Sequence, residues 1–189
     1  WKSIDKKKRN EFRRSEKNNL KVEFSDNTQD FISIYYRRLD ALNSYRFYYF
    51  PEEYIRKLDS KIILYVYDQH NEICGAQIWL KDGNNLFYFL SADVAEKKQF
   101  GPTTFGIINM VKWAYKNKIE NIHLGGGTET LFNYKSKFSL EKISYFLGKR
   151  IINQEAYNYM VKAHEDKNGQ LGNKEYFPLY RLDTDESHK

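Results

Sequence analysis

The apolar and polar residues of this 189-residue chain follow two kinds of spacing, one typical of helices and one typical of strands. Apolar residues three and four positions apart mark helices with one buried face, which we expect over residues 28–43 and 103–116. Two-residue alternation and short apolar runs mark strands. They predict strands at residues 20–24, 61–67, 72–81, 86–92, 121–124 and 143–152. A basic helix is expected over residues 4–18, and shorter helices after Pro51, over 131–138 and over 155–164.

The order of these elements predicts a mixed sheet. The strands at 61–67, 72–81 and 86–92 follow one another closely, and the Asp-Gly-Asn-Asn run at 82–85 is a strong hairpin signal. In the middle strand, alternation should place Cys74, Ala76, Ile78 and Leu80 on one face. The helix at 103–116 then separates two strands that we expect to be parallel. The predicted fold class is α/β (α+β), a mixed central sheet with helices on both faces.

Composition limits the class of protein. Apolar residues make up 41% of the chain and aromatic residues 17%, which is enough for a hydrophobic core at this length. No run approaches the roughly 20 apolar residues of a membrane-spanning helix. Cys74 is the single cysteine, which argues against a disulfide framework and against a Cys-rich metal site. We therefore expect a cytoplasmic protein with no membrane span and no metal.

The positive charge is concentrated at the N-terminus. Residues 1–21 carry nine lysines and arginines against three acidic residues, a net charge of +6, which equals the net charge of the whole chain. Two interpretations are open: the basic helix contacts phosphates of RNA or of a nucleotide-linked substrate, or it is a solvated linker. Because the chain starts at Trp1 rather than at methionine, we expect residues 1–20 to connect a missing upstream domain with a domain formed by residues 21–189.

The strand predicted at 121–124 ends in a run of glycines. Gly125, Gly126 and Gly127 follow directly, and a helix is predicted soon after them. Glycines let a ligand approach the backbone because no Cβ stands in the way, and the start of a helix presents free N–H groups. Ligands in such sheets favour the carboxyl ends of strands. The glycines and Ser91, at the end of a neighbouring strand, should lie side by side and form a binding site.

The helix predicted at 131–138 carries a lysine on its apolar side. Leu131, Lys135 and Phe138 share one stripe of that helix. A lysine is costly to bury unless it lines a polar site, so Lys135 is a candidate functional residue. The alternative is a lysine whose charged end reaches solvent, with Phe132 and Tyr134 as packing residues.

An ordered set of motifs resembles the GNAT acyltransferase fold, and more narrowly the second GNAT-like domain of the Fem family, the peptidoglycan bridge aminoacyltransferases of cell-wall synthesis. The resemblance covers nearly the whole chain. It is carried by the basic helix and strand at 7–22, the aromatic segment at 46–54, Phe-Tyr-Phe-Leu-Ser-Ala at 87–92, Lys-Trp-Ala at 112–114, the glycine strand end at 123–127, the aromatic-Lys-x-x-Phe-Ser helix at 134–139, the segment at 146–150 and the closing Phe-Pro-x-Tyr-Arg motif at 177–181.

The resemblance implies a mechanism and partners. In this fold two central strands open into a V that holds the acyl donor, and here the strands at 86–92 and 121–125 would form it. Lys135 would stabilise the oxyanion that forms when an amine attacks an ester or thioester. Tyr134 would position the donor or relay a proton. The missing upstream domain would be a second GNAT-like domain, and the acceptor a cell-envelope precursor.

The identity of the donor is the main open question. GNAT enzymes that use acyl-CoA hold its pyrophosphate with a Gln/Arg-x-x-Gly-x-Gly/Ala loop, whereas residues 98–104 read Lys-Gln-Phe-Gly-Pro-Thr-Thr. Only Gly101 remains, and Pro102 supplies no N–H, although Thr103 and Thr104 still open a helix. The departure favours aminoacyl-tRNA, which the basic helix would contact, and leaves acyl-CoA as the alternative. Either donor is a substrate, and we expect no bound cofactor.

The acceptor side offers two candidate residues. The aromatic stretch 45–50 would line the acceptor cleft, with Tyr48 in it and Arg46 available for a phosphate or carboxylate. Ordinary loop packing is the alternative. No general base stands out. His123 is expected to be a core histidine, and Glu129 is a candidate base whose alternative role is to complement the dipole of its helix.

These observations lead us to expect a Fem-like N-acyltransferase that moves an aminoacyl or acyl group to an amine of a cell-envelope precursor. Two alternatives stay open. One is an acyl-CoA-dependent N-acetyltransferase that acts on a small amine. The other is a non-catalytic GNAT-like module that binds RNA or a partner domain.

Overall fold

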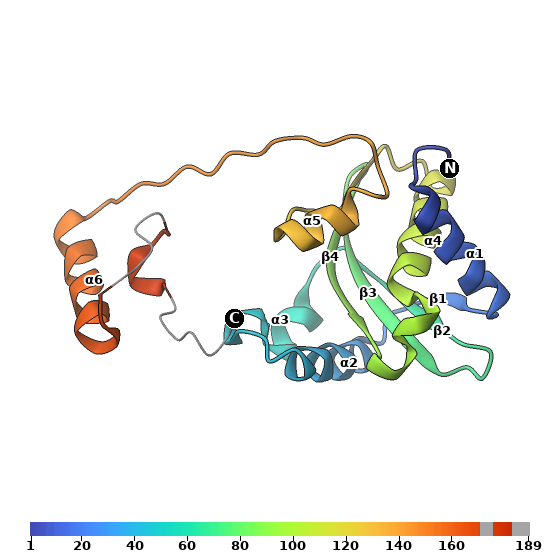
Figure 1. Cartoon of the computed structure of the whole chain (residues 1–189), viewed down its shortest axis with the longest axis horizontal. Helices are drawn as coiled ribbons and strands as arrows, with labels where there is room; N and C mark the ends of the chain where they lie inside the picture. The colour runs from blue at the N-terminus through green and yellow to red at the C-terminus, as the bar shows by residue number, and fades with distance from the viewer. Residues whose placement is uncertain (171–175, 183–189) are drawn as a thin grey trace. The chain divides into compact units, whose positions relative to one another are not determined.

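The computed structural model describes residues 1–170 and 176–182 (Figure 1). The chain divides into two compact units, residues 1–142 and residues 143–189. The first unit contains the helices α1 (Lys6–Lys17), α2 (Thr28–Ala41), α3 (Glu52–Lys57), α4 (Pro102–Lys116) and α5 (Glu129–Lys135), the strands β1 (Lys21–Ser25), β2 (Lys61–Tyr67), β3 (Ile73–Asp82), β4 (Asn85–Asp93) and β5 (Asn121–His123), and the short 3-10 helices η1 (Arg46–Tyr48) and η2 (Ala95–Phe100).

The helices and strands predicted for the first unit are confirmed, with small shifts at their ends. The local chemistry explains where they begin. The Asp5 carboxylate accepts a hydrogen bond of 2.8 Å from the Lys7 amide at the start of α1, and the Asn27 side chain accepts one of 3.0 Å from the Gln29 amide at the start of α2. Both are N-cap bonds, which satisfy amides that have no partner within the helix. Pro51 caps α3 and is not part of its first turn.

The five strands form one sheet in the order β1-β2-β3-β4-β5. Neighbours from β1 to β4 are antiparallel, and β4 pairs with β5 in parallel. The connection between these two parallel strands runs through α4, as expected for a crossover helix. The predicted mixed sheet is therefore confirmed.

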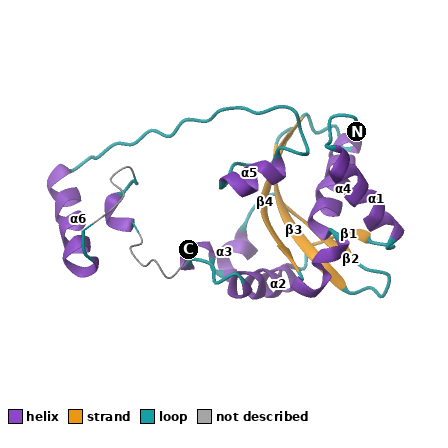
Figure 2. Ribbon diagram, in the orientation of Figure 1, coloured by secondary structure: helices purple, strands orange, loops and turns teal. Residues whose placement is uncertain are grey.

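Helices cover both faces of this sheet (Figure 2). On one face, α4 packs against β2, β3 and β4, and α1 packs against α4. On the other face, α2 packs against β3 and β4. Each face has its own buried apolar cluster, one including Trp79 and Ile107 on the α4 side, and one including Phe31 and Ile78 on the α2 side. The sheet is therefore buried on both sides, which explains its near-continuous apolar strands.

Two bulges interrupt the regular alternation of the sheet. The first shifts the register between Val66 and Tyr67 of β2 and its partner β3. As a result Cys74 belongs to the apolar cluster on the α4 side, whereas Ala76 and Ile78 belong to the cluster on the α2 side. The prediction that these residues share one face is wrong at Cys74, because a bulge reverses the direction of the side chains that follow it.

The second bulge lies in β4. Ile78 pairs with Leu90 and Trp79 with Tyr88, so Phe89 has no residue opposite it in β3. Tyr88 consequently packs on the α4 side, and Phe89 and Leu90 pack on the α2 side. Such bulges bend the strand and increase its local twist.

The second unit contains α6 (Gln154–Asn168) and the 3-10 helix η3 (Leu179–Arg181). The Leu179 amide donates a hydrogen bond of 3.0 Å to the Tyr157 hydroxyl, and the rings of Tyr157 and Phe177 stack at 5.9 Å. The helix predicted at 155–164 is confirmed. The strand predicted at 143–152 is wrong, since these residues have no regular structure. An apolar pattern alone does not form a strand, because a strand also needs a hydrogen-bonded neighbour.

Two further features concern residues 1–170 and 176–182. None of their helices has both the length and the apolar character needed to cross a membrane. They contain no group of three or more His, Cys, Asp and Glu side chains that could hold a metal ion.

Candidate active site

The parallel strands β4 and β5 separate after a short pairing. Only Asn85, Leu86 and Phe87 of β4 have partners in β5, and the last pair joins Phe87 to His123. Beyond this pair, the bulge bends β4. On the other side, Gly125, with φ of +74°, turns the backbone that follows β5. A Cβ placed on Gly125 would lie 4.0 Å from the Tyr88 carbonyl oxygen, so the glycine run begins opposite Tyr88.

The ammonium group of Lys135 lies at this separation. Lys135 Nζ donates a hydrogen bond of 2.8 Å to the Gly126 carbonyl oxygen and lies 5.6 Å from the centre of the Tyr88 ring. A Cβ on Gly125 would lie 3.5 Å from Nζ. Partial burial lowers the pKa of Lys135, because desolvation disfavours the charged form. The structure thus brings Lys135, Gly125 and Gly126 together.

The third glycine allows α5 to start close to the strand end. Gly127 has φ of +148°, and a Cβ at this position would lie only 2.9 Å from Cβ of Leu131. A larger residue would push α5 away from the glycine run. Gly127 therefore sets the distance between α5, which carries Lys135, and the end of β5.

Ser91 does not lie beside the glycines, contrary to our expectation. Its hydroxyl accepts a hydrogen bond from the Tyr88 hydroxyl, and Gly125 has Tyr88 rather than Ser91 as its neighbour on β4. The reason is geometric, because β4 and β5 stop pairing at Phe87 and diverge before Ser91. In that arrangement the Ser91 side chain holds the Tyr88 ring in place.

Tyr134 points to a different environment from its neighbour Lys135. Its hydroxyl lies 3.0 Å from Thr104 Oγ1 on α4, and its ring lies beneath the ammonium of Lys8, 4.2 Å from Nζ to the ring centre. Burial strongly raises the pKa of the Tyr134 phenol. Successive residues of a helix point about 100° apart, which is why these two side chains diverge.

Lys8 connects three helices on that side. It is 8% exposed, and its Nζ donates to Glu11 Oε2 at 2.6 Å and to Thr104 Oγ1 at 3.2 Å. Sequence reasoning counted Lys8 among the basic residues of α1 and missed this role. The signal was present, because Lys8, Phe12 and Ser15 lie on one face of the helix and all three are buried.

The start of α4 is flanked by two carboxylates. The Thr103 hydroxyl donates to the Asp93 carboxylate, whose two oxygens both lie 2.7 Å from it. On the other flank, a Cβ on Gly101 would lie 3.0 Å from Glu11 Oε1. Burial raises the pKa of Asp93, and the hydrogen bond from Thr103 and the charge of Arg38 oppose this rise. The positive end of the α4 dipole therefore already faces negative charge from the protein itself.

Arg46 and Tyr48 lie in η1, away from these groups. Both side chains are exposed, and the Tyr48 carbonyl oxygen accepts a 2.7 Å hydrogen bond from the Tyr35 hydroxyl of α2. The aromatic segment reaches the sheet through Phe50, whose ring lies 5.9 Å from the ring of the bulged residue Phe89. Phe50 thus contacts β4 at Phe89, on the α2 side, next to Tyr88, which lies near Lys135.

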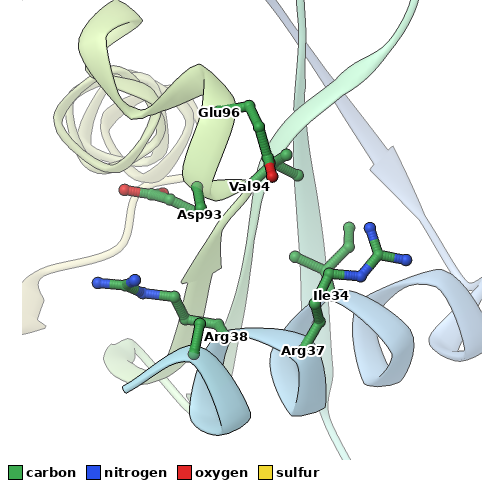
Figure 3. Close-up of a pocket in the computed structure, with 8 residues that line it drawn as sticks. Ile34, Arg37, Arg38, Asp93, Val94 and Glu96 are labelled. Carbon is green, nitrogen blue, oxygen red and sulfur yellow. The ribbon is translucent and has the colours of Figure 1, made fainter.

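A cavity of about 90 Å³ lies on the α2 side, where β4 ends. Arg37 and Arg38 of α2 line one wall, and Asp93 and Glu96 line the other (Figure 3). Figure 3 shows Arg38 extending toward the side of Asp93 and Arg37 extending the opposite way. The cavity is therefore not arranged around a single anion. Sequence reasoning did not single out this arginine pair, because an Arg-Arg step in a helix resembles an ordinary solvated face.

His123 and Glu129 have local roles in the structure. His123 is exposed, and its Nδ1 accepts a 3.1 Å hydrogen bond from the Gly125 amide. The expectation of a core histidine is therefore wrong. His123 is the last residue of β5, and its side chain accepts a hydrogen bond from the glycine turn rather than packing in the core. Glu129 lies in the first turn of α5, where a negative charge complements the helix dipole.

Comparison with known proteins identifies the family. The family model for the GNAT acetyltransferase domain matches residues 6–136, which include β4, β5, α5 and the separation that holds Lys135. No curated protein matches the sequence significantly.

Solved structures share the fold at low sequence identity. An aminoglycoside acetyltransferase from an uncultured soil metagenomic sample, in complex with sisomicin, matches with a TM-score of 0.54 and 12% identity, over 72% of this chain and 99% of its own. FemX matches with a TM-score of 0.56 and 12% identity, over 67% of this chain and 49% of FemX. L-PGS from Bacillus licheniformis matches with a TM-score of 0.50 and 14% identity, over 62% of this chain and 38% of its own. The match to the domain model, supported by this shared fold, shows that the chain belongs to the GNAT acetyltransferase family and is an acyltransferase.

Proposed function

We propose that this protein is a Fem-like N-acyltransferase that moves an aminoacyl group from tRNA to an amine of a cell-envelope precursor. The observation that carries the proposal is the position of the Lys135 ammonium at the separation of β4 and β5, against Gly126 and beside Gly125. The FemX likeness supports the fold, and the chain spans about half of FemX. A second GNAT-like domain would then complete the protein, in the cytoplasm.

The surroundings of Lys135 suit a group that stabilises negative charge. An ammonium has three N–H donors, and within the described part of the chain one of them is used, by Gly126. The other donors are available to an oxyanion, in a partly desolvated place where a fixed positive charge acts strongly. Such a donor is worth about 3–4 kcal/mol of transition-state stabilisation.

The proposed chemistry is a direct transfer. The acceptor amine attacks the ester carbonyl carbon of the donor, and the carbonyl oxygen becomes an oxyanion held by Lys135. When this intermediate collapses, the C–O bond to the ribose breaks and an amide bond remains. The proton lost by the amine passes to the leaving ribose oxygen, so the step needs no dedicated base from the protein.

Tyr134 fits a positioning role in this scheme. Its hydroxyl is engaged with Thr104, and its raised pKa makes it a poor proton donor at neutral pH. Through Thr104 and Lys8 it fixes α5 against α4 and α1. We propose that this contact holds α5 so that the neighbouring residue, Lys135, faces the donor.

The start of α4 supports a donor without a pyrophosphate. A CoA pyrophosphate at this helix end would meet the Asp93 and Glu11 carboxylates, which flank Thr103 and Gly101. Pro102 supplies no N–H there, and the Thr104 hydroxyl is engaged with Lys8 and Tyr134. The Glu11 charge is paired with Lys8, so Glu11 obstructs this helix end by its position beside Gly101, while Asp93 adds negative charge. Both features favour an aminoacyl ester over acyl-CoA.

Acceptor binding is proposed for the α2 side. Arg46 and Tyr48 are exposed in η1, and their segment reaches the bulged part of β4 through Phe50. Arg46 would bind a phosphate or carboxylate of the precursor. This arrangement would bring the acceptor to β4 from the face opposite α4.

An acyl-CoA-dependent N-acetyltransferase is the second candidate. It is favoured by the match over 99% of an aminoglycoside acetyltransferase, whose whole length corresponds to this fold. In that case the acceptor would be a small amine, and Glu11 would have to move away from Gly101. Lys135 would hold the oxyanion in the same way.

Direct binding of donors separates the candidates. The protein is titrated with acetyl-CoA and, in parallel, with a pool of aminoacyl-tRNA at low and high salt. The proposal predicts tRNA binding that weakens with salt and requires the aminoacyl end, and no saturable binding of acetyl-CoA.

A charge-reversed variant tests the contribution of α1 to that binding. Lys6, Lys7, Arg13 and Arg14 are exposed on α1, and reversal of their charges should flatten the salt dependence of tRNA binding.

In the donor titration, saturable acetyl-CoA binding would support the second candidate. Binding of uncharged tRNA without transfer of any group would indicate a non-catalytic module.

A further inference from the structure

An apolar groove lies at the edge of the sheet, far in the fold from the separation of β4 and β5. Its volume is about 690 Å³, and it is lined by residues of β1, of α4 and of the segment before α1. Phe24 of β1 is 44% exposed and Tyr115 of α4 is 86% exposed. The rings of Phe24 and Trp113 are in contact, with centres 5.7 Å apart. Exposed aromatic groups gathered in a groove are typical of a binding surface.

The groove lies beside a strand with a free edge. Within the described residues β1 is the first strand of the sheet and pairs only with β2. Val22 and Phe24 pair with Val66 and Leu64, which belong to the apolar cluster on the α4 side. A further strand beside β1 would therefore place every second side chain in the groove, next to Trp113.

The rim of the groove is positively charged. Lys112 and Lys116 of α4 line it. Lys112 is half exposed, with Glu16 of α1 3.9 Å from its Nζ, and Lys116 is exposed in the last turn of α4. A ligand with acidic groups beside its apolar side chains would complement these lysines.

A second copy of this chain fits the groove poorly. Symmetric antiparallel pairing of two β1 strands would centre on Glu23 and place the two Glu23 side chains opposite each other, which is destabilising. It would also bring two lysine rims together. The charges thus favour a partner of opposite sign.

We propose that β1 and this groove bind an extended, acidic segment of a partner protein as an additional strand. Main-chain hydrogen bonds to β1 supply part of the affinity. Every second side chain enters the groove, where apolar residues pack against Phe24 and Trp113 and acidic residues of the same alternate set contact Lys112 and Lys116 at the rim. This surface is separate from the proposed transfer site, so the interaction recruits or places the enzyme.

A pair of synthetic peptides tests the proposal. In the first, a seven-residue strand carries phenylalanine and valine at its two central groove-facing positions, glutamate at its two outer groove-facing positions and threonine at the positions that face away. In the second, lysine replaces glutamate. Binding is measured by fluorescence anisotropy of labelled peptide. We expect the acidic peptide to bind about tenfold more tightly than the basic one. Hydrogen exchange at β1 amides that face away from β2 should slow when the acidic peptide binds.

Charge reversal provides the control. The double variant Lys112→Glu with Lys116→Glu should reverse the preference between the two peptides, whereas Lys81→Glu, on β3 and outside the groove, should leave it unchanged. Equal binding of both peptides, or no binding of either, would overturn the proposal. Concentration-dependent dimerisation that the peptide competes with would assign the groove to a second copy. Binding to phosphatidylglycerol vesicles without peptide binding would assign it to a membrane.

Discussion

Lys135 and Tyr134 are neighbours on α5, and the regions that surround their polar atoms differ in one respect. Around Lys135, the chain offers an open strand end, glycines without side chains and an ammonium with one protein partner among the described residues. Around Tyr134, the hydrogen-bonding groups are engaged with one another, from Lys8 through Thr104 to the phenol. The first region can accept a ligand without losing an internal bond, and the second cannot. From this difference we propose that Lys135 takes part in the chemistry and that Tyr134 supports the position of α5.

The start of α4 lies on the Tyr134 side, because Thr104 is hydrogen-bonded to Tyr134. Helix starts often hold phosphates, but here Asp93 and Glu11 already flank this one. A protein carboxylate in that place does for the helix what a bound anion would do. Our donor proposal therefore rests on a GNAT helix start at which the protein's own carboxylates lie.

The largest expected effect comes from removing the positive charge of Lys135. Lys135→Met should lower kcat for acyl transfer by about 10²- to 10³-fold, because a preorganised oxyanion donor is lost. Lys137→Met, on the same segment and exposed, is the matched control and should stay within about twofold of the wild type. Transfer assays on both purified variants would check this, and unchanged activity of Lys135→Met would remove Lys135 from the mechanism.

Variants on the supporting side should affect stability more than transfer. Lys8→Met leaves Thr104 and Glu11 without their buried partner and should lower the free energy of unfolding by about 1–3 kcal/mol. Tyr134→Phe loses one hydrogen bond and should cost about 1 kcal/mol. Urea unfolding measures both, with Lys7→Met as the exposed control. If Tyr134→Phe loses as much transfer activity as Lys135→Met, the comparison fails and Tyr134 is catalytic.

Opening the start of α4 should have a smaller effect. In Glu11→Gln a like charge near Gly101 is removed, so acetyl-CoA should bind about fivefold more tightly, which corresponds to about 1 kcal/mol. Glu16→Gln, on the exposed side of the same helix, should not change it. Isothermal titration would measure both. Tight acetyl-CoA binding by the wild type would show that the helix end is open and that the donor assignment is wrong.

The smallest expected effect is an acid-dependent loss of stability near η2. Lys97 pairs with Asp68 and Glu72, and its hydrogen bond lowers the pKa of Asp68 from 3.8 to about 2. Because the folded-state pKa is depressed, this contribution is present above the unfolded value and is lost as pH falls from about 4 to 2. Thermal unfolding of Asp68→Asn should therefore depend less on pH in that window, while the exposed control Asp59→Asn should follow the wild type.

The fold could be predicted because its signals are local. The hairpin at 82–85 rests on turn residues, and the β4–α4–β5 crossover rests on two apolar strands separated by one amphipathic helix. The polar surroundings of Lys135 could be predicted for a similar reason, since a charged residue on an apolar helical stripe needs a polar environment. Its role in transfer stays a prediction. Each of these signals is contained in one continuous stretch of the chain.

The remaining features depend on contacts that the sequence pattern does not contain. The β4–β5 pairing ends at Phe87 and His123, and beyond it Gly125 faces Tyr88 rather than Ser91. The burial of Lys8 depends on α4 and α5, which follow it by about a hundred residues. The apolar run at 143–152 resembles a strand, but only a neighbouring strand could make it one.

The proposed mechanism depends on a partly desolvated Lys135 ammonium at the separation of β4 and β5. NMR titration of the side-chain signals of ¹³C-labelled lysines tests it without knowledge of any substrate, with Lys135 assigned from the signal that Lys135→Met removes. We expect Lys135 to titrate at lower pH in the folded chain than in the same chain unfolded in urea, because burial lowers its pKa. Titration at the same pH in both states would show that the ammonium is in open solvent, and would contradict the site proposed for it.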